Sequence, residues 1–303
     1  MGSGLVKAYS IPEAGNDFPY FCLFFESPDK IHVLHAPESA RKAIEQTLDL
    51  YWDGKVDTKY EHCVESITLE NCYAFKILAR QQNTLIRRAL CHIFSDLYSL
   101  GYQIVGASDL SNSSVVSAIF FQFVDLTETA EFVCLNLDRD DRLQFINFPS
   151  QMNKLFENVI KESYVPGYSK RNKGSNEVSY KLNDDSWLTS GQEAIDSNIL
   201  LMECIRLIEH EGYQIQASVN LKSKGSISLD KNPKEADCLF FTKCAELVEK
   251  SSGKFVALIL PNDKEEFQII MIAGTKDMRS SLEKSVRRFK SAFKFTTFKV
   301  DND

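Results

Sequence analysis

The feature of this sequence that most restricts its fold is an internal repeat. The segment Leu100-Gly101-Tyr102-Gln103-Ile104 returns 111 residues later as Glu211-Gly212-Tyr213-Gln214-Ile215. Upstream of both segments, apolar residues recur with the i, i+3, i+4, i+7 spacing of an amphipathic helix: Leu90, Ile93, Phe94 and Leu97 in the first copy and Leu201, Cys204, Ile205 and Ile208 in the second. We therefore expect two copies of one fold, each with a helix that ends at a glycine.

A second pattern, two short strands joined by a turn, occurs three times. In each case polar turn residues separate two runs that are rich in aromatic and β-branched residues, which is typical of a β-hairpin. The paired runs are 21–26 with 31–36, 132–137 with 143–148, and 255–260 with 267–272. An amphipathic helical pattern follows each pair, so we expect every hairpin to lead into a helix.

Together these patterns predict tandem repeats of the form β-β-α-β-α-β-β. We divide the chain into an N-terminal segment at 1–17, a first unit at 18–126, a second unit at 130–247 and a partial third unit, a hairpin plus a basic helix, at 254–303. The expected fold class is α+β, with antiparallel or mixed sheets and helices covering a face. The last hairpin of one unit could also pair with the first hairpin of the next across 127–129, and the sequence leaves both pairings open.

The motifs that commonly carry enzyme chemistry are absent from the sequence. It contains no Cys-x-x-Cys pair, no Gly-x-Ser-x-Gly elbow and no glycine-rich phosphate loop. His32 and His35 are expected on opposite faces of one strand, which does not suit a shared metal ion. The basic run Lys170–Lys173 lies between two glycines and is expected to be a loop. We therefore predict no catalytic residue, no metal site and no cofactor.

The distribution of charge points away from nucleic acid and toward the C-terminal region. The whole chain has 35 basic and 42 acidic residues, a net charge of −7, so we expect no nucleic-acid partner. Residues 276–300, however, contain eight basic and two acidic residues. The predicted helix there either packs its apolar side on a sheet or offers a patch to an anionic lipid surface or acidic partner. The patch would consist of Lys284, Arg287, Arg288, Lys290 and Lys294.

Cysteine usage and hydropathy indicate the compartment. The eight cysteines are scattered singly, mostly inside apolar runs, as reduced core thiols are. The N-terminus has no apolar stretch of signal-peptide length, and the longest apolar runs are far too short to cross a membrane. We expect a cytoplasmic protein, which would be peripheral at a membrane if the basic patch binds lipid.

Several segments resemble a eukaryotic tandem-repeat family with the pattern W-x-x-G-I, E-F-K-L-x-x-x-P-W, G-W-x-L, S-x-D-x-S and D-x-L-F-F. The matching segments are Trp52-Asp53-Gly54-Lys55-Val56, Tyr73-Ala74-Phe75-Lys76-Ile77, Ser186-Trp187-Leu188-Thr189, Ser218-Val219-Asn220-Leu221 and Asp237-Cys238-Leu239-Phe240-Phe241. That family has no assigned activity, so the resemblance implies a repeat fold alone. The start of the chain also resembles raftlins, which implies lipid anchoring through Gly2, although Ser3 and Val6 depart from the acylation pattern.

Two classes of function fit these observations. The first is a non-enzymatic protein-interaction or scaffold module, because the duplication carries no duplicated polar constellation; its candidate contact aromatics are Trp52 and Trp187. The second is either a membrane-peripheral adaptor that uses the basic C-terminal helix or an enzyme with a site between the repeats. A cleft between the units that holds converging carboxyl, Cys or His groups would favour the enzyme, and a flat junction would favour the module. The sequence does not specify the protein partner.

Overall fold

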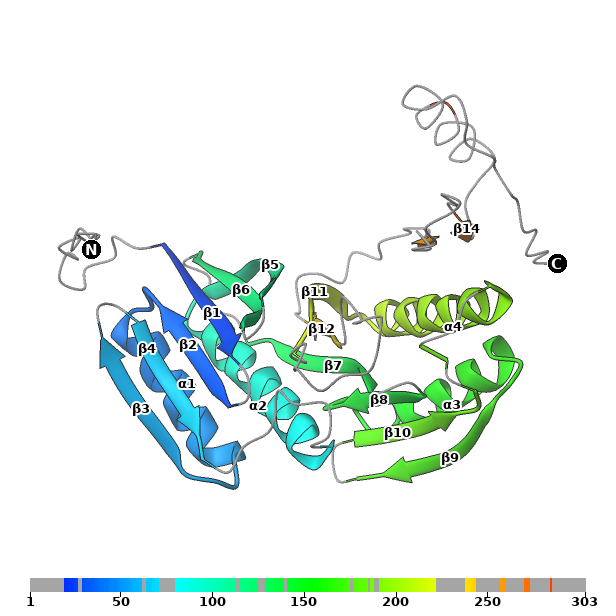
Figure 1. Cartoon of the computed structure of the whole chain (residues 1–303), viewed down its shortest axis with the longest axis horizontal. Coiled ribbons are helices and arrows are strands. Elements are labelled where there is room, and N and C mark those ends of the chain that lie inside the picture. The colour runs from blue at the N-terminus through cyan, green and yellow to red at the C-terminus, as the bar shows by residue number, and fades with distance from the viewer. Residues whose placement is uncertain are drawn as a thin grey trace, which may run out of the picture.

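A computed structural model describes residues 19–26, 29–61, 64–70, 80–112, 115–124, 129–138, 141–174, 177–184, 186–187, 191–221, 238–243, 257–259, 270–272 and 284. In these residues, two six-stranded sheets alternate with two pairs of helices (Figure 1). Each sheet and the two helices that pack against it form one unit, and the two units have the same order of elements.

Unit 1 contains eight elements. They are β1 (Tyr20–Glu26), β2 (Lys30–Leu34), α1 (Glu38–Tyr51), β3 (Val56–Glu61), β4 (Val64–Leu69), α2 (Arg80–Ser99), β5 (Tyr102–Asn112) and β6 (Val115–Phe123). The strands form sheet A in the order β3-β4-β2-β1-β6-β5, and every neighbouring pair is antiparallel. Helices α1 and α2 pack beside each other against one face of this sheet, which we call its inner face.

Unit 2 repeats this order element by element. Its elements are β7 (Glu131–Asp138), β8 (Arg142–Ile146), α3 (Met152–Ser163), β9 (Tyr168–Lys173), β10 (Glu177–Leu182), α4 (Gly191–His210), β11 (Gln214–Val219) and β12 (Cys238–Lys243). Sheet B has the order β9-β10-β8-β7-β12-β11, and its pairs are again antiparallel. Each sheet is therefore completed within its own unit, which decides between the two pairings that the sequence left open.

The predicted fold class, a tandem α+β repeat, is confirmed, with one difference inside the repeat. Two strands connect the helices of each unit, so the order is β-β-α-β-β-α-β-β, with one strand more than expected. The additional strands β3 and β9 lie at the sheet edges, and β9 contains the basic run that we expected to be a loop. Edge strands are commonly rich in charged residues, which discourage pairing with other chains and also hide the apolar alternation of a strand.

Backbone conformation repeats along with topology. Helices α2 and α4 are followed, two residues after their last residue, by Gly101 and Gly212, whose φ angles are 87° and 88°. Glycine adopts such positive φ angles readily, and we expected one at the end of each helix. Strands β2 and β8 are followed by His35 and Asn147, whose φ angles are 59° and 66°. His35 therefore lies beyond its strand, and the expectation that it shares one strand with His32 is wrong.

Helix α2 joins the units because it is packed between the two sheets (Figure 1). The Phe94 ring lies 5.8 Å from Phe121 of sheet A and 5.0 Å from Phe240 of sheet B, measured between ring centroids. Helices α3 and α4 cover the opposite face of sheet B. The layers therefore run sheet A, α1 with α2, sheet B, α3 with α4.

Two further strands are described beyond unit 2. Strands β13 (Ala257–Ile259) and β14 (Ile270–Ile272) pair antiparallel and lie within the two runs of the third predicted hairpin. The basic helix that we predict after this hairpin lies outside the described residues, except Lys284.

Candidate functional site

The basic patch predicted from the sequence is almost entirely outside the described residues. Lys284 is helical and exposed. The other four members, Arg287, Arg288, Lys290 and Lys294, are not among the residues that the structure describes. Among the helices that it does describe, none combines the length and apolar character of a membrane span. The role of the patch stays a prediction.

The two tryptophans lie in different units and are engaged within the protein. Trp52 follows α1 and is buried, with 6% of its surface exposed. A Cβ atom on Gly54 would lie 2.7 Å from Trp52 Nε1, so the glycine allows the indole to occupy this place. Trp187 is partly buried, and its Nε1 donates a hydrogen bond of 3.0 Å to the Arg142 carbonyl oxygen. Both side chains contribute to the structure of their own units, and their role as contact aromatics stays a prediction.

The junction between the units is a packed interface. Phe94 of α2 meets Phe132 edge to face at 5.7 Å and Phe240 at 5.0 Å, while Tyr98 meets Phe132 at 6.1 Å. Ser95 Oγ accepts a hydrogen bond of 3.3 Å from the backbone N–H of Phe132. Apolar and polar contacts therefore hold α2 on the face of sheet B that lies opposite α3 and α4.

Titratable groups at this junction are suited to holding it together. Burial, with a smaller effect of Cys238, raises the pKa of the Cys91 thiol well above its usual range, so Cys91 stays a thiol at neutral pH. Arg88 Nη2 lies 3.9 Å from Glu177 Oε2. Burial raises the pKa of Glu177 and the Arg88 charge opposes this shift. A protonated thiol and a paired carboxyl are features of an interface, whereas nucleophilic catalysis needs a thiolate or a free base.

The face of sheet B that holds α2 has a counterpart in sheet A, which the strand registers identify. Cys22 pairs with Leu34 and Phe120 in sheet A, and Cys134 pairs with Ile146 and Phe240 in sheet B. At five of these places the two faces present residues of similar class, whereas the same register puts Asn136 of unit 2 where unit 1 has Phe24. In order, the equivalent pairs are Tyr20 with Phe132, Cys22 with Cys134, Leu34 with Ile146, Ala118 with Cys238 and Phe120 with Phe240.

On sheet A these residues lie on the outer face, away from α1 and α2. Tyr20 is 53% exposed and Phe120 is 39% exposed, whereas their equivalents Phe132 and Phe240 are buried under α2. Cys22 is two residues from Tyr20 in β1, pairs with Phe120 of β6 and is partly buried. Unit 1 thus carries an aromatic and aliphatic face of the kind that receives a helix in unit 2. We call it the outer face of sheet A.

One end of this face carries a polar row of three side chains. His32 Nδ1 lies 2.9 Å from Ser66 Oγ and its Nε2 lies 2.7 Å from Glu26 Oε2, while the ring stacks on Phe24 at 4.5 Å. A serine, a histidine and a carboxylate in contact resemble a hydrolase triad. The three residues lie on adjacent antiparallel strands, however, with Ser66 inside β4, where the ladders use the backbone donors that an oxyanion would need.

The same row in unit 2 shows its structural meaning. The register makes Asp138, Gln144 and Ser179 the equivalents of Glu26, His32 and Ser66, respectively. These residues are buried on the side of sheet B where α2 packs. Because glutamine cannot act as a general base, what the row retains in both units is hydrogen-bonding capacity. In unit 2 it forms the polar end of the surface on which α2 packs.

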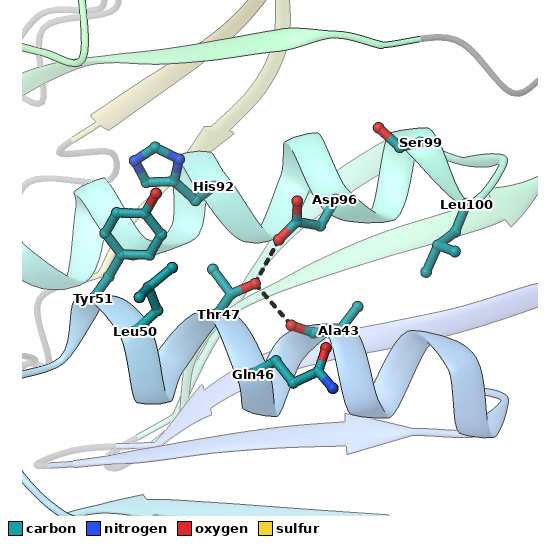
Figure 2. Close-up of a pocket in the computed structure, with 9 residues that line it drawn as sticks. All are labelled: Ala43, Gln46, Thr47, Leu50, Tyr51, His92, Asp96, Ser99 and Leu100. Carbon is teal, nitrogen blue, oxygen red and sulfur yellow. Dashed lines mark hydrogen bonds between the residues drawn. The ribbon is translucent and has the colours of Figure 1, made fainter.

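A pocket of about 440 Å³ lies between α1 and α2 in unit 1 (Figure 2). Thr47 Oγ1 lies 2.5 Å from Asp96 Oδ2 and 2.7 Å from the Ala43 carbonyl oxygen, so Thr47 connects the two helices. The His92 ring stacks on Tyr51 with 3.9 Å between centroids. Burial lowers the pKa of His92, although Asp96 opposes the shift, and the imidazole is therefore neutral at pH 7.

The polar groups of this pocket are specific to unit 1. The repeat places Val159 and Leu207 where unit 1 has Thr47 and Asp96, and Glu203 where it has His92. No group of three or more His, Cys, Asp or Glu side chains arranged for a metal ion occurs in the described part of the chain. The hydrogen bond between Thr47 and Asp96 links α1 to α2.

Sequence reasoning missed the outer face of sheet A. Its signal is present in the run Ile119-Phe120-Phe121, because alternation along a strand places Phe120 on the face opposite its two apolar neighbours. A strand that is apolar on both faces is expected to be covered on both. In unit 2 this expectation is met by α2.

Comparison with known proteins identifies the repeat independently. One family model, of a domain without assigned activity, matches the chain twice, at residues 19–122 and 131–242. No curated protein and no solved structure matches the chain. Nothing in these comparisons bears on the resemblance to raftlins.

Proposed function

We propose, from the premise that this chain belongs to that uncharacterised domain family and carries its domain twice, that it is a non-enzymatic protein-interaction module. The outer face of sheet A is its binding surface, and the ligand is a helix of a partner protein. The observation that carries this proposal is the contact of α2 with sheet B, in which one copy of the domain receives a helix on the equivalent face.

The chemistry of the outer face supports this function. Tyr20 and Phe120 flank a small residue, Cys22, so a side chain from a helix can insert between two rings, as Phe94 inserts between Phe132 and Phe240. Exposed aromatic residues in a contiguous apolar patch are characteristic of protein-binding surfaces. The adjacent polar row of Glu26, His32 and Ser66 supplies hydrogen-bonding groups that fix the register of a bound helix.

The junction between the units gives less support to an enzyme. From the sequence, we expected an enzyme to have a cleft between the units that holds converging reactive groups. The residues described at the junction are interlocked aromatic rings, a protonated thiol and the Arg88–Glu177 ion pair. These groups stabilise the contact of α2 with sheet B.

The experiment that tests the proposal compares the proteins captured by three forms of the tagged full-length chain. We expect Phe120→Asp to lose a partner that the wild-type chain retains, because the substitution places a charge at the centre of the apolar face. The matched control is Val165→Asp, a change at a 93% exposed residue outside this face. Identical sets of captured proteins for wild type and Phe120→Asp, determined by quantitative mass spectrometry, would refute the proposal.

A further inference from the structure

We propose that the partner of the outer face of sheet A is α4 of a second copy of this chain. This inference rests on the proposed function and specifies its ligand. The internal contact of α2 with sheet B serves as the template: in the assembly, α4 of one copy takes the place of α2, and sheet A of the next copy takes the place of sheet B. The two copies then continue the layer order that the chain has within itself.

Helix α4 presents an apolar side beyond the one that faces its own sheet. Leu200, Cys204 and Ile208 are completely buried in the core of unit 2. Ile199 and Met202, which the repeat places at the positions of Arg88 and Cys91, remain partly exposed. In α2 these two positions face sheet B. The corresponding side of α4 therefore has apolar residues at these two positions, with Arg206 and Glu209 where α2 has Ser95 and Tyr98. None of the elements that the structure describes packs over this side.

At one pair of positions, the residues on α4 and on the outer face of sheet A both differ from their equivalents at the internal interface. At the internal interface, Arg88 of α2 meets Glu177 at the start of β10. The equivalents on the free surfaces are Ile199 of α4 and Val64 at the start of β4, as the pairing of Val64 with Leu34 and of Glu177 with Ile146 establishes. An ion pair at one interface thus corresponds to an apolar pair at the other. Either exchange alone would bury an unpaired charge, whereas both together are compatible.

A second pair of positions conserves volume in the same manner. Cys91 of α2 lies near Cys238 of β12, so two side chains of moderate size meet there. On the free surfaces, the equivalent residues are Met202, which is larger than cysteine, and Ala118, which is smaller. A large residue opposite a small one fills the same space as two intermediate ones, and packed interfaces tolerate such exchanges best.

The polar end of the interface is retained as well. Arg87 is completely buried in α2, and the equivalent position of α4 is Asn198. Asn198 would lie over the end of sheet A that carries the row of Glu26, His32 and Ser66. An amide side chain has both donors and acceptors for such a row, and it brings no charge that would need a buried partner.

The geometry of this contact makes the assembly open. The outer face of sheet A and the free side of α4 are different surfaces at opposite ends of the layer order (Figure 1). A contact between two different surfaces is heterologous, and it leaves one unused surface at each end of a dimer. Further copies can therefore add, and the protein is expected to form short linear oligomers whose size rises with concentration.

The test is a mixing experiment with two full-length variants, measured by sedimentation velocity. Phe120→Asp disables the sheet surface and Met202→Asp disables the helix surface. We expect wild type to self-associate with a Kd of about 1–100 μM and each variant alone to associate at least about tenfold more weakly. An equimolar mixture of the two should form a 1:1 dimer that grows no further, because it retains one intact pair of surfaces. The control Val165→Asp should behave as wild type.

A milder pair of variants protects the test against folding defects. Val64→Glu and Ile199→Arg introduce the charges of the internal interface, so each alone should weaken association and their mixture should restore it. A monomeric wild-type protein over this concentration range would overturn the inference, as would association that Met202→Asp leaves unchanged. Either result leaves the proposed function standing if Phe120→Asp still loses a captured partner. If capture is also insensitive to Phe120→Asp, both proposals fail.

Discussion

The two units have the same strands in the same order, but their sheets are buried differently. Strand β2 of sheet A alternates between buried and partly exposed residues, whereas its equivalent β8 is buried at all five positions. The difference arises because α2 covers the second face of sheet B and no described element covers the second face of sheet A. The position of a unit in the layer order therefore determines which of its surfaces are core and which are left uncovered by the described elements.

The units also differ in how they use polar residues under the helices. Unit 1 places Glu65 in the interior between β4 and α1 and joins α1 to α2 through Thr47 and Asp96. The equivalent positions in unit 2 are Val178, Val159 and Leu207. Unit 2 is thus the more apolar version of the same scaffold. Exchanging residues between the units tests what each difference contributes.

The largest expected effect comes from a charge at equivalent buried positions of the two long helices. Leu97 and Ile208 are both completely buried. Ile208→Asp should cost at least about 5 kcal/mol and raise hydrogen exchange mainly in residues 131–243, because it disrupts the core between sheet B and its own helices. Leu97→Asp should raise exchange in both units, since α2 serves both sheets. Equal and local effects of the two changes would show that the units fold independently.

A smaller but more specific effect is expected at the next pair of equivalent positions. Phe94 contacts rings from both sheets, whereas Ile205 is partly buried beside the core of unit 2. Phe94→Ala should lower the free energy of unfolding by about 3–4 kcal/mol and Ile205→Ala by about 1 kcal/mol in the monomer. Denaturant titration measures both. A cost of Ile205→Ala as large as that of Phe94→Ala would mean that α4 is already covered within the chain.

The repeat and the fold class could be predicted because they depend on local patterns. The amphipathic spacing around Leu97 and Ile208, and the glycines that end both helices, survive in each copy. Strands β3 and β9 escaped detection because charged edge strands such as Tyr168–Lys173 lack the alternation of apolar residues on which strand prediction depends. The order of the sheets was also beyond reach, since antiparallel pairing between distant strands leaves no local trace.

The candidate surface was harder to predict than the fold. Trp52 and Trp187 stood out by composition, but rarity does not indicate exposure, and these indoles contribute to the structure of their own units. Tyr20 and Phe120 are ordinary strand residues in the sequence. They become a candidate surface only when the register brings them beside Cys22 and when comparison with unit 2 shows what such a face can hold.

The buried carboxyl of unit 1 gives a pH-dependent difference between the units. Burial, followed by the nearby Glu45 carboxylate, raises the pKa of Glu65 to about 7 from an ordinary value of 4.5, although Arg41 acts in the opposite direction. The folded protein therefore binds more protons than the unfolded chain between these values. Its free energy of unfolding should decrease as pH rises through this interval, with a slope of at most about 1.4 kcal/mol per pH unit from this group.

Replacing this carboxyl by the residue of unit 2 should remove that slope. Glu65→Val introduces the residue that unit 2 has at the equivalent position, Val178. The variant should therefore be more stable than wild type at pH 8 by about 2 kcal/mol and nearly equal to it at pH 5. Urea titrations across this range measure the difference between the two proteins, in which the contributions of other groups cancel. Parallel curves for wild type and Glu65→Val would show that Glu65 titrates alike in the folded and unfolded states.

The smallest effect is expected from Thr47→Val in the pocket between α1 and α2, where the equivalent residue of unit 2 is Val159. The substitution preserves shape and removes the hydroxyl that lies 2.5 Å from Asp96 Oδ2. Because Asp96 is exposed, water can replace the lost hydrogen bond, and the cost should be about 0.5–1 kcal/mol.

The double variant Thr47→Val with Asp96→Leu reproduces the apolar pair of unit 2 and should return to within about 0.5 kcal/mol of wild type. A double variant that remains as unstable as Thr47→Val would mean that Asp96 stabilises unit 1 independently of Thr47. A double variant as stable as wild type would instead show that the polar pair of unit 1 and the apolar pair of unit 2 support the helix packing equally well. The polar pair of the pocket would then add nothing to the stability of unit 1.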